Sequence, residues 1–289
     1  MATLKPRDLI TANLHLVSLP DVVLRINEMV EDPNSNAAEI GSLIAEDPAL
    51  TARLLRVVNS SLFGFPSQID TISMAITILG TRQLRDLVMA TAVVDQFHDL
   101  TNEVVDMETF WCHSVTTAVA ARTLSAYLKV RNTERFFVTG LLHDIGKLVM
   151  YVSHPDASKQ VIELTGEKTL DTSQLEQSVF GFSHADVGAE LLRAWKLPDS
   201  LIEPTMYHHR PIRATHYKNE TAIVHVADVI ANNLHAPISA DDDNPADKVA
   251  LLTLGLGQDF IGKLHEMVYE QLDDSLQVIF YDSKNSKAA

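Results

Sequence analysis

The sequence predicts an all-α fold. Apolar side chains recur every three to four residues along most of the chain, which is the spacing of one helix face. Glycine and proline number only 11 each in 289 residues, too few for the many tight turns of a β fold. Hydrophobic residues make up 46% of the chain. A chain of about 300 residues buries about 75% of its unfolded surface, so these helices can pack around a substantial core.

The first hundred residues predict a series of short helices separated by capping and breaking residues. Pro20 suits the first turn of a helix, Asn36 can cap the next one, and Gly80 ends another just before Thr81 starts the last. The apolar stripes between these residues have helical spacing. The strings that carry them are DVVLRINEMV, AAEIGSLIAE, ALTARLLRVVN, TISMAITIL and RQLRDLVMATAVVDQF.

Longer helices are predicted after a polar break at 98–106, the first of them from about Met107 to Leu128. The segment TERFFVTGLLHDIGKLVMYV contains strand-favouring FFV and LVMYV. Its start at Thr133 and its apolar stripe nevertheless favour a helix, which we expect to break at Gly146. The remaining helices are expected at about 155–165, 172–179, 184–195, 198–208, 220–234, 246–254 and 258–279, with a linker at 235–247.

Charge and cysteine content narrow the partners and the compartment. The formal net charge is −15, and such a surface repels nucleic acid and anionic lipid, so we expect neither as a partner. The single cysteine, Cys112, cannot form an internal disulfide and suits a reducing cytoplasm. The N-terminal residues lack the pattern of a signal peptide, and the apolar runs are shorter than the roughly 20 residues of a membrane span. We therefore expect a cytoplasmic protein.

A His-Asp dipeptide lies in the most apolar part of the second half. His143-Asp144 follows VTGLL and precedes Ile145, so both side chains are expected to be buried. An unpaired buried charge is expensive. Coordination of a cation would account for it, and imidazole with carboxylate suits Zn, Fe, Mn or Ni. The alternative is a hydrogen-bonded His-Asp pair at a helix break.

Four other segments of the same half offer similar groups. His113 lies within an amphipathic helix, His184 begins one, and His208-His209 ends the next. Asp228 has apolar neighbours on both sides and is expected to face inward, where a carboxylate needs a cation or a strong donor. Any one of these residues is more often structural than a ligand, but five segments together favour a shared metal site.

The order of these residues, H…HD…H…HH…D, resembles the HD phosphohydrolase superfamily. It is most similar to the HD-GYP branch, whose members hydrolyse cyclic dinucleotides. The strings LLHDIGKL, HADVGAELLRAWKLP and VADVI match as well. The preceding half, from LPDVVLRINEMV to QLRDLV, resembles the HDOD domain throughout, including its DP-x-L, LLR-x-VNS and AI-x-x-LG elements.

The resemblance implies a multi-helix bundle of the HDOD and HD type over residues 12–230. An N-terminal helical lobe of about 12–100 would pack on an HD-like metal lobe of about 106–235. Residues 236–289 would then form a C-terminal helical extension.

The resemblance also implies two divalent transition-metal ions about 3.5–4 Å apart. Asp144 would bridge the ions and help to activate water for attack on phosphorus. The ligands of the first ion would be His113, His143 and Asp228, and those of the second His184, His208 and His209. Lys147 would direct its ammonium towards a substrate phosphate, the alternative being a solvated lysine at the start of a helix.

The chain departs from the HD-GYP pattern after His209. HD-GYP enzymes continue there with a glutamate and a glycine-rich GYP loop, whereas this chain reads RPIRATHYKN. Thr109 stands where three-metal relatives carry a glutamate, so we expect at most two metals. His225, three residues before Asp228, could support a ligand from behind. Many HDOD proteins lack the ligands and act as signalling modules, but this chain has the whole set.

Two functions follow as alternatives. The first is a signalling-related, metal-dependent phosphohydrolase or phosphodiesterase with Asp144 and Lys147 as catalytic residues. Its substrate would be a phosphorylated small molecule or a nucleotide. The second is a non-catalytic regulatory or protein-interaction module that retains the metal site and binds a signalling protein.

Overall fold

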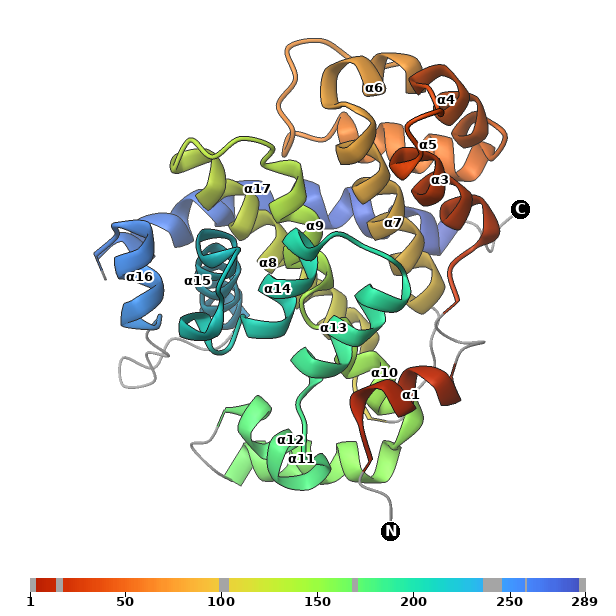
Figure 1. Cartoon of the computed structure of the whole chain (residues 1–289). Coiled ribbons are helices and arrows are strands. Elements are labelled where there is room, and N and C mark those ends of the chain that lie inside the picture. The colour runs from red at the N-terminus through yellow and green to blue at the C-terminus, as the bar shows by residue number, and fades with distance from the viewer. Residues whose placement is uncertain are drawn as a thin grey trace.

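The molecule is built from helices packed in two groups (Figure 1). Within the residues that the computed structural model describes, the secondary structure is helical and contains no strand. The prediction of an all-α fold is therefore confirmed. The described residues are 4–13, 18–98, 104–167, 171–235, 246–257 and 259–285.

Three of the helices in the N-terminal lobe have starts that are fixed by local side-chain caps. Asn36 accepts a hydrogen bond from the Glu39 backbone N–H, and Asp47 and Thr71 cap the starts of two further helices in the same way. Each cap satisfies a backbone donor that the first helical turn leaves unpaired. The helices are α3 (Asp21–Glu31), α4 (Ala37–Ala45), α5 (Pro48–Val58), α6 (Ile72–Leu79) and α7 (Thr81–His98).

The second lobe is built around one buried helix. That helix is α8 (Met107–Tyr127), which is buried over most of its length and packs against three later helices, α9 (Glu134–Leu142), α15 (Lys218–His235) and α17 (Phe260–Asn285). The helices that follow are α9 (Glu134–Leu142), α10 (Ile145–Ser153), α11 (Pro155–Glu167), α12 (Thr172–Phe180), α13 (His184–Ala194), α14 (Asp199–Tyr207), the 3₁₀ turn η1 (Pro211–Arg213) and α15 (Lys218–His235). Helix α7 packs on α9 and joins the two lobes.

The helix break in the apolar segment lies at His143-Asp144, between α9 and α10, and the prediction of a break at Gly146 was wrong. Gly146 lies in the first turn of α10. A Cβ atom added there would lie 2.0 Å from the backbone oxygen of His184 and 2.6 Å from the backbone nitrogen of Gly188. Glycine is therefore required because α10 and α13 cross with their backbones almost in contact.

Two further parts of the chain pack on the second lobe. Helix α1 (Pro6–Ala12), which the periodicity did not predict, packs on α10 and α13. The C-terminal extension consists of α16 (Lys248–Leu254), which packs on α15, and α17 (Phe260–Asn285), which packs on both α8 and α5 (Figure 1). Most of the predicted linker, residues 236–245, lies outside the described residues, and the predicted domain limits remain a prediction.

A buried polar network joins the two lobes. The Arg85 side chain is only 3% exposed and forms ion pairs with Asp86 and Glu31. It also donates a hydrogen bond to Asn27, whose side-chain amide donates to the backbone oxygen of Trp195 at 3.3 Å. Because a buried charge needs such partners, this network fixes α3 and α7 against the end of α13.

The stretch Glu134–Ser153, which comprises α9 and α10, meets the length and hydropathy of a membrane span by composition alone. This differs from the expectation that no segment would do so. Of its most apolar window, 78% is buried inside the fold, which is typical of the core of a soluble helical domain.

Candidate metal centre

The seven side chains singled out by the sequence lie together inside the second lobe, in two adjacent clusters. The first cluster consists of His113 on α8, His143 at the α9–α10 turn and Asp228 on α15. The Nε2 atoms of the two histidines are 3.3 Å apart. Asp228 Oδ1 lies 3.2 Å from His113 Nε2 and 3.6 Å from His143 Nε2.

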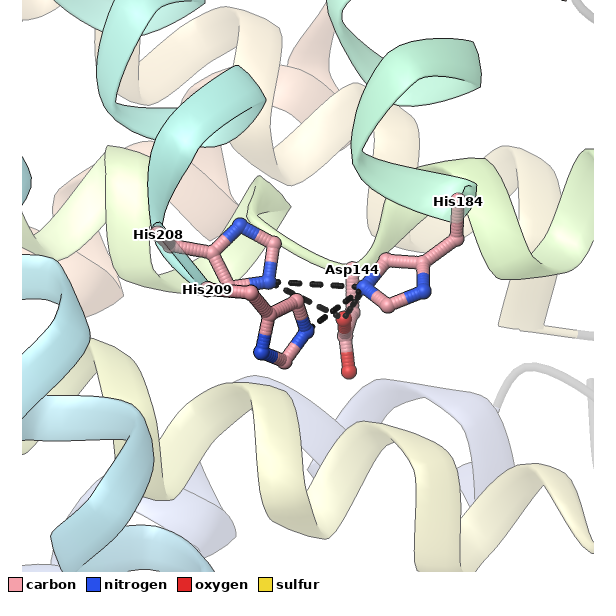
Figure 2. A group of neighbouring side chains, drawn as sticks. All are labelled: Asp144, His184, His208 and His209. Atoms are coloured by element: carbon pink, nitrogen blue, oxygen red, sulfur yellow. Dashed lines mark hydrogen bonds and ion pairs between the residues drawn. The ribbon is translucent and has the colours of Figure 1, made fainter. Parts of the chain in front are cut away.

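The second cluster consists of Asp144, His184, His208 and His209 (Figure 2). His184 begins α13, and the two adjacent histidines follow the end of α14. His184 Nε2 lies 3.4 Å from His208 Nε2, 3.1 Å from His209 Nε2 and 3.0 Å from Asp144 Oδ1. Three segments that are far apart in the sequence thus direct ring nitrogens and one carboxylate oxygen at a common point.

The Asp144 carboxylate lies between the two clusters. Its Oδ1 faces the second cluster, and its Oδ2 lies 3.5 Å from His113 Nε2 and 3.4 Å from His143 Nε2. Successive residues of a continuous helix point about 100° apart. The break between α9 and α10 allows His143 and Asp144 to face the same interior space, so the turn itself builds the centre.

Backbone hydrogen bonds set the tautomers of two histidines. His143 Nδ1 lies 2.7 Å from the Gly140 oxygen, and His208 Nδ1 lies 2.7 Å from the Thr205 oxygen. A carbonyl oxygen can only accept, so each Nδ1 carries the proton. With this proton fixed on Nδ1, the Nε2 atom of each ring faces the cluster, and a metal binds to Nε2 when that nitrogen carries no proton.

A buried carboxylate that the sequence analysis missed orients His184. Glu176 on α12 is only 3% exposed. Its Oε2 accepts hydrogen bonds from His184 Nδ1 at 2.6 Å and from the His184 backbone nitrogen at 2.7 Å. In the string TSQLEQSVF, Glu176 cannot be told apart from an ordinary polar residue on the surface of a helix. No local signal distinguishes it, because its role depends on the contact between α12 and α13.

His225 supports the second cluster, as the sequence suggested. Its Nδ1 donates to the backbone oxygen of His208 at 2.7 Å, and its Nε2 accepts from the backbone nitrogen of Asp247 at 2.9 Å. One imidazole therefore links the residue that carries a ligand to the start of α16.

The two carboxylates of the clusters are ionised although they are buried. Burial alone would raise the pKa of Asp144, but the charges of His143 and Lys147 outweigh it and hold this pKa well below its usual value. Burial would also raise the pKa of Asp228. Hydrogen bonds from His113 and His143 outweigh this effect and hold the pKa of Asp228 well below its usual range. The interior of the lobe thus holds two negatively charged carboxylates beside Lys147 and the clustered histidines.

The histidines of the second cluster divide by charge. Burial would lower the pKa of His184, but the carboxylates of Glu176 and Asp144 raise it to about 9. Burial and neighbouring imidazoles lower the pKa of His208 well below its usual value and that of His209 to about 4. Neutral His208 and His209 have lone pairs available for a metal.

Lys147 is paired and largely buried, so the alternative of a solvated lysine does not hold. Its Nζ donates to Asp144 Oδ2 at 2.6 Å, and its side chain is 19% exposed. Burial opposes the charge, but the Asp144 carboxylate raises the pKa of Lys147 above its usual value. The ammonium therefore remains charged at neutral pH.

The donor set fits divalent metal ions. Ligand atoms at about 2.0–2.2 Å from a tetrahedral ion lie roughly 3.3–3.6 Å apart, and the contacts within the clusters include separations from 3.0 to 3.8 Å. Asp144 Oδ1 is fully buried and accepts no well-directed hydrogen bond from any described residue. Several ring nitrogens face each other. A proton can be shared by only one such pair of nitrogens, whereas one metal ion can bind all the nitrogens of a cluster.

The helical fold and the buried His/Asp centre define a domain of the HD-like type. The model of the HDOD domain matches residues 16–211, and the chain belongs to the HDOD domain family. The matched residues include six of the seven clustered side chains, and Asp228 lies beyond them.

Solved structures and one curated protein are similar to this chain. A proposed phosphohydrolase from Shewanella amazonensis SB2B is 25% identical, with 94% of this chain and 96% of that chain covered and a TM-score of 0.71. An HDOD domain protein of unknown function from Geobacter sulfurreducens is 26% identical, with 94% and 99% covered and a TM-score of 0.70. An uncharacterized protein from Treponema pallidum (strain Nichols) is 27% identical over 195 residues, which are 66% of this chain and 37% of the relative. The match thus spans little more than a third of that relative's length.

Proposed function

We propose that this chain is a metal-dependent phosphohydrolase or phosphodiesterase with two divalent transition-metal ions in its two clusters. The observation that carries the proposal is the position of Asp144, an ionised carboxylate that faces each cluster with a different oxygen. Bound Fe, Mn, Zn or Ni ions would supply Lewis-acid activation of water and of the phosphoryl group. The fit of the donor set and the name of the Shewanella relative support this reading.

The roles of the side chains follow from where they lie. His113, His143 and Asp228 would hold one ion and His184, His208 and His209 the other, with Asp144 between them. Lys147 keeps its proton and lies beside Asp144, so it suits electrostatic stabilisation of a phosphate oxyanion rather than proton abstraction. The substrate class is a phosphate ester of a small molecule or a nucleotide. We extend the proposal to a signalling role in the cytoplasm, which rests on family membership and on the single cysteine.

A regulatory module that keeps the metal site is the alternative. It is favoured by one observation, namely that the N-terminal lobe, α3–α7, contributes none of the clustered side chains. A separate lobe of this kind could serve a protein partner. In a module, removing the metal would lower thermal stability or partner binding, because a ligand that binds only the native state stabilises it.

Elemental analysis of the protein, purified without chelators or a polyhistidine tag, tests metal binding first. We expect about two equivalents of transition metal per chain, followed by hydrolysis in a screen of phosphomonoesters and phosphodiesters. Metal without any turnover would favour the module. No metal, even after reconstitution with Fe, Mn and Zn, would contradict both readings and leave the histidines with a structural role.

The variant Glu176→Gln is expected to weaken metal binding by about 10- to 100-fold, the usual effect of losing a hydrogen-bonded partner behind a ligand. The negative charge of Glu176 orients His184 and makes the imidazole a stronger electron-pair donor to a metal. The amide of glutamine lacks this charge. A titration against a coloured chelator measures the affinity. The matched control is Glu163→Gln, at an exposed glutamate on α11. Equal affinities in the two variants would show that Glu176 has no part in metal binding.

A further inference from the structure

A small hollow opens beside the second cluster. Its lining includes His209, which is also one of the clustered histidines, together with Tyr207, Arg210 and Arg213. The His209 side chain is 18% exposed, whereas His184 and His208 are fully buried. His209 is thus the part of the second cluster that borders the hollow.

Two arginines line this hollow from the same short turn. The backbone nitrogen of Arg213 donates to the oxygen of Arg210 at 2.9 Å, which closes the 3₁₀ turn η1. Arg210 immediately precedes the turn and Arg213 ends it, and the side chains of both line the hollow. Ile212 between them is 71% exposed and projects elsewhere, while Pro211 is buried and fixes the turn.

Neither arginine is neutralised. Among the described residues, no hydrogen bond or ion pair involves the guanidinium of Arg210 or Arg213. The carboxylate of Asp186 also lines the hollow, but it accepts hydrogen bonds from the Ser183 backbone and hydroxyl at 2.8 and 2.9 Å and is committed to the start of α13. Two unpaired guanidinium groups in a chain of net charge −15 are expected to attract an anion.

The hollow suits a compact anion. Its volume is about 30 Å³, enough for one or two oxygens of a phosphate group and too small for an aromatic base. A guanidinium binds phosphate oxygens through parallel N–H donors. We propose that Arg210 and Arg213 form an anion subsite that takes a phosphate of the substrate other than the one that is cleaved.

The inference rests on the proposed function and names the substrate class more closely as a molecule with at least two phosphate groups. The cleaved phosphate would lie at the clusters, and the second would lie past His209 against the arginines. The RPIR segment would thus set specificity where the sequence departs from the glycine-rich loop of HD-GYP enzymes.

Binding of radiolabelled inorganic phosphate, measured by equilibrium dialysis, tests the subsite without any turnover. The protein is used as purified and again after chelation of its metal. The test variant is the double substitution Arg210→Gln and Arg213→Gln. The control is Arg25→Gln with Arg82→Gln, which removes two charges from exposed positions in the N-terminal lobe that do not line the hollow. Melting temperatures confirm that both double variants are folded.

We expect the parent and the control to bind phosphate with equal affinity. The affinity of the test variant should be at least about tenfold lower, because charge-assisted hydrogen bonds are lost. This difference should persist after chelation. Equal affinity in parent and test variant, or no phosphate bound by the parent at millimolar concentrations, would overturn the subsite. Failure of the proposed function would give a different result. The protein would then contain no metal and hydrolyse no phosphate ester, but it would still bind phosphate through the two arginines.

Discussion

The variant Asp144→Asn is expected to lose at least about 10²- to 10³-fold in kcat/KM, the range found when one electrostatic contact with a reacting group is removed. The carboxylate places one oxygen against each of the two clusters. An amide retains its size but has one oxygen and no charge, so it can serve one cluster at most. We also expect the metal content to fall by about half or more. Hydrolysis of an aryl phosphate and elemental analysis measure the two effects.

A control separates this effect from a general loss of charge. Asp199→Asn removes an exposed carboxylate from α14, the helix that leads to His208, and should leave turnover and metal content unchanged. Circular dichroism shows whether each variant keeps its helices. Parent-like hydrolysis by Asp144→Asn would refute the role of this carboxylate in the reaction.

The variant Gly146→Ala is expected to destabilise the fold by about 3 kcal/mol or more, at the upper end of the cost of overpacking. Its Cβ atom would lie 2.0 Å from the His184 backbone oxygen, and a backbone atom cannot rotate away as a side chain can. Helices α10 and α13 must separate, which moves Asp144 away from His184. We expect a fall in melting temperature of roughly 6–12 °C, together with weaker metal binding.

The matched control for Gly146→Ala is Gly262→Ala in α17. A Cβ atom there meets nothing within 4 Å, so alanine should be neutral or stabilise the helix by up to about 1 kcal/mol. Calorimetry of both variants gives the comparison. A melting temperature of Gly146→Ala within a degree or two of the parent would mean that the close crossing of α10 and α13 does not exist in solution.

Local sequence determined the helices, because the forces that start and end a helix act within one turn. The side chains of Asn36, Asp47 and Thr71 accept hydrogen bonds from backbone nitrogens three residues ahead. Such contacts can be predicted from the sequence. Helix α1, with seven residues, was not predicted, and its position depends on packing against α10 and α13.

The candidate ligands could also be predicted from the sequence, because their residue types and apolar neighbours are visible along the chain. In the structure His113, His143 and Asp228 lie in one cluster, and His184, His208 and His209 lie around Asp144. Whether they bind metal and perform hydrolysis stays a prediction that elemental analysis and the Asp144 variant test.

Only the tertiary structure decided the features that depend on contacts between distant segments. Glu176 resembles any polar helix residue until α12 packs on α13 and brings it within 2.6 Å of His184. Gly146 resembles a helix breaker until the crossing of α10 and α13 shows that its missing Cβ allows their backbones to meet. The hollow beside His209 depends likewise on the η1 turn. The apolar periodicity of a segment indicates which face of its helix is buried. The distance between two buried faces depends on how two helices pack, and this cannot be predicted from either segment alone.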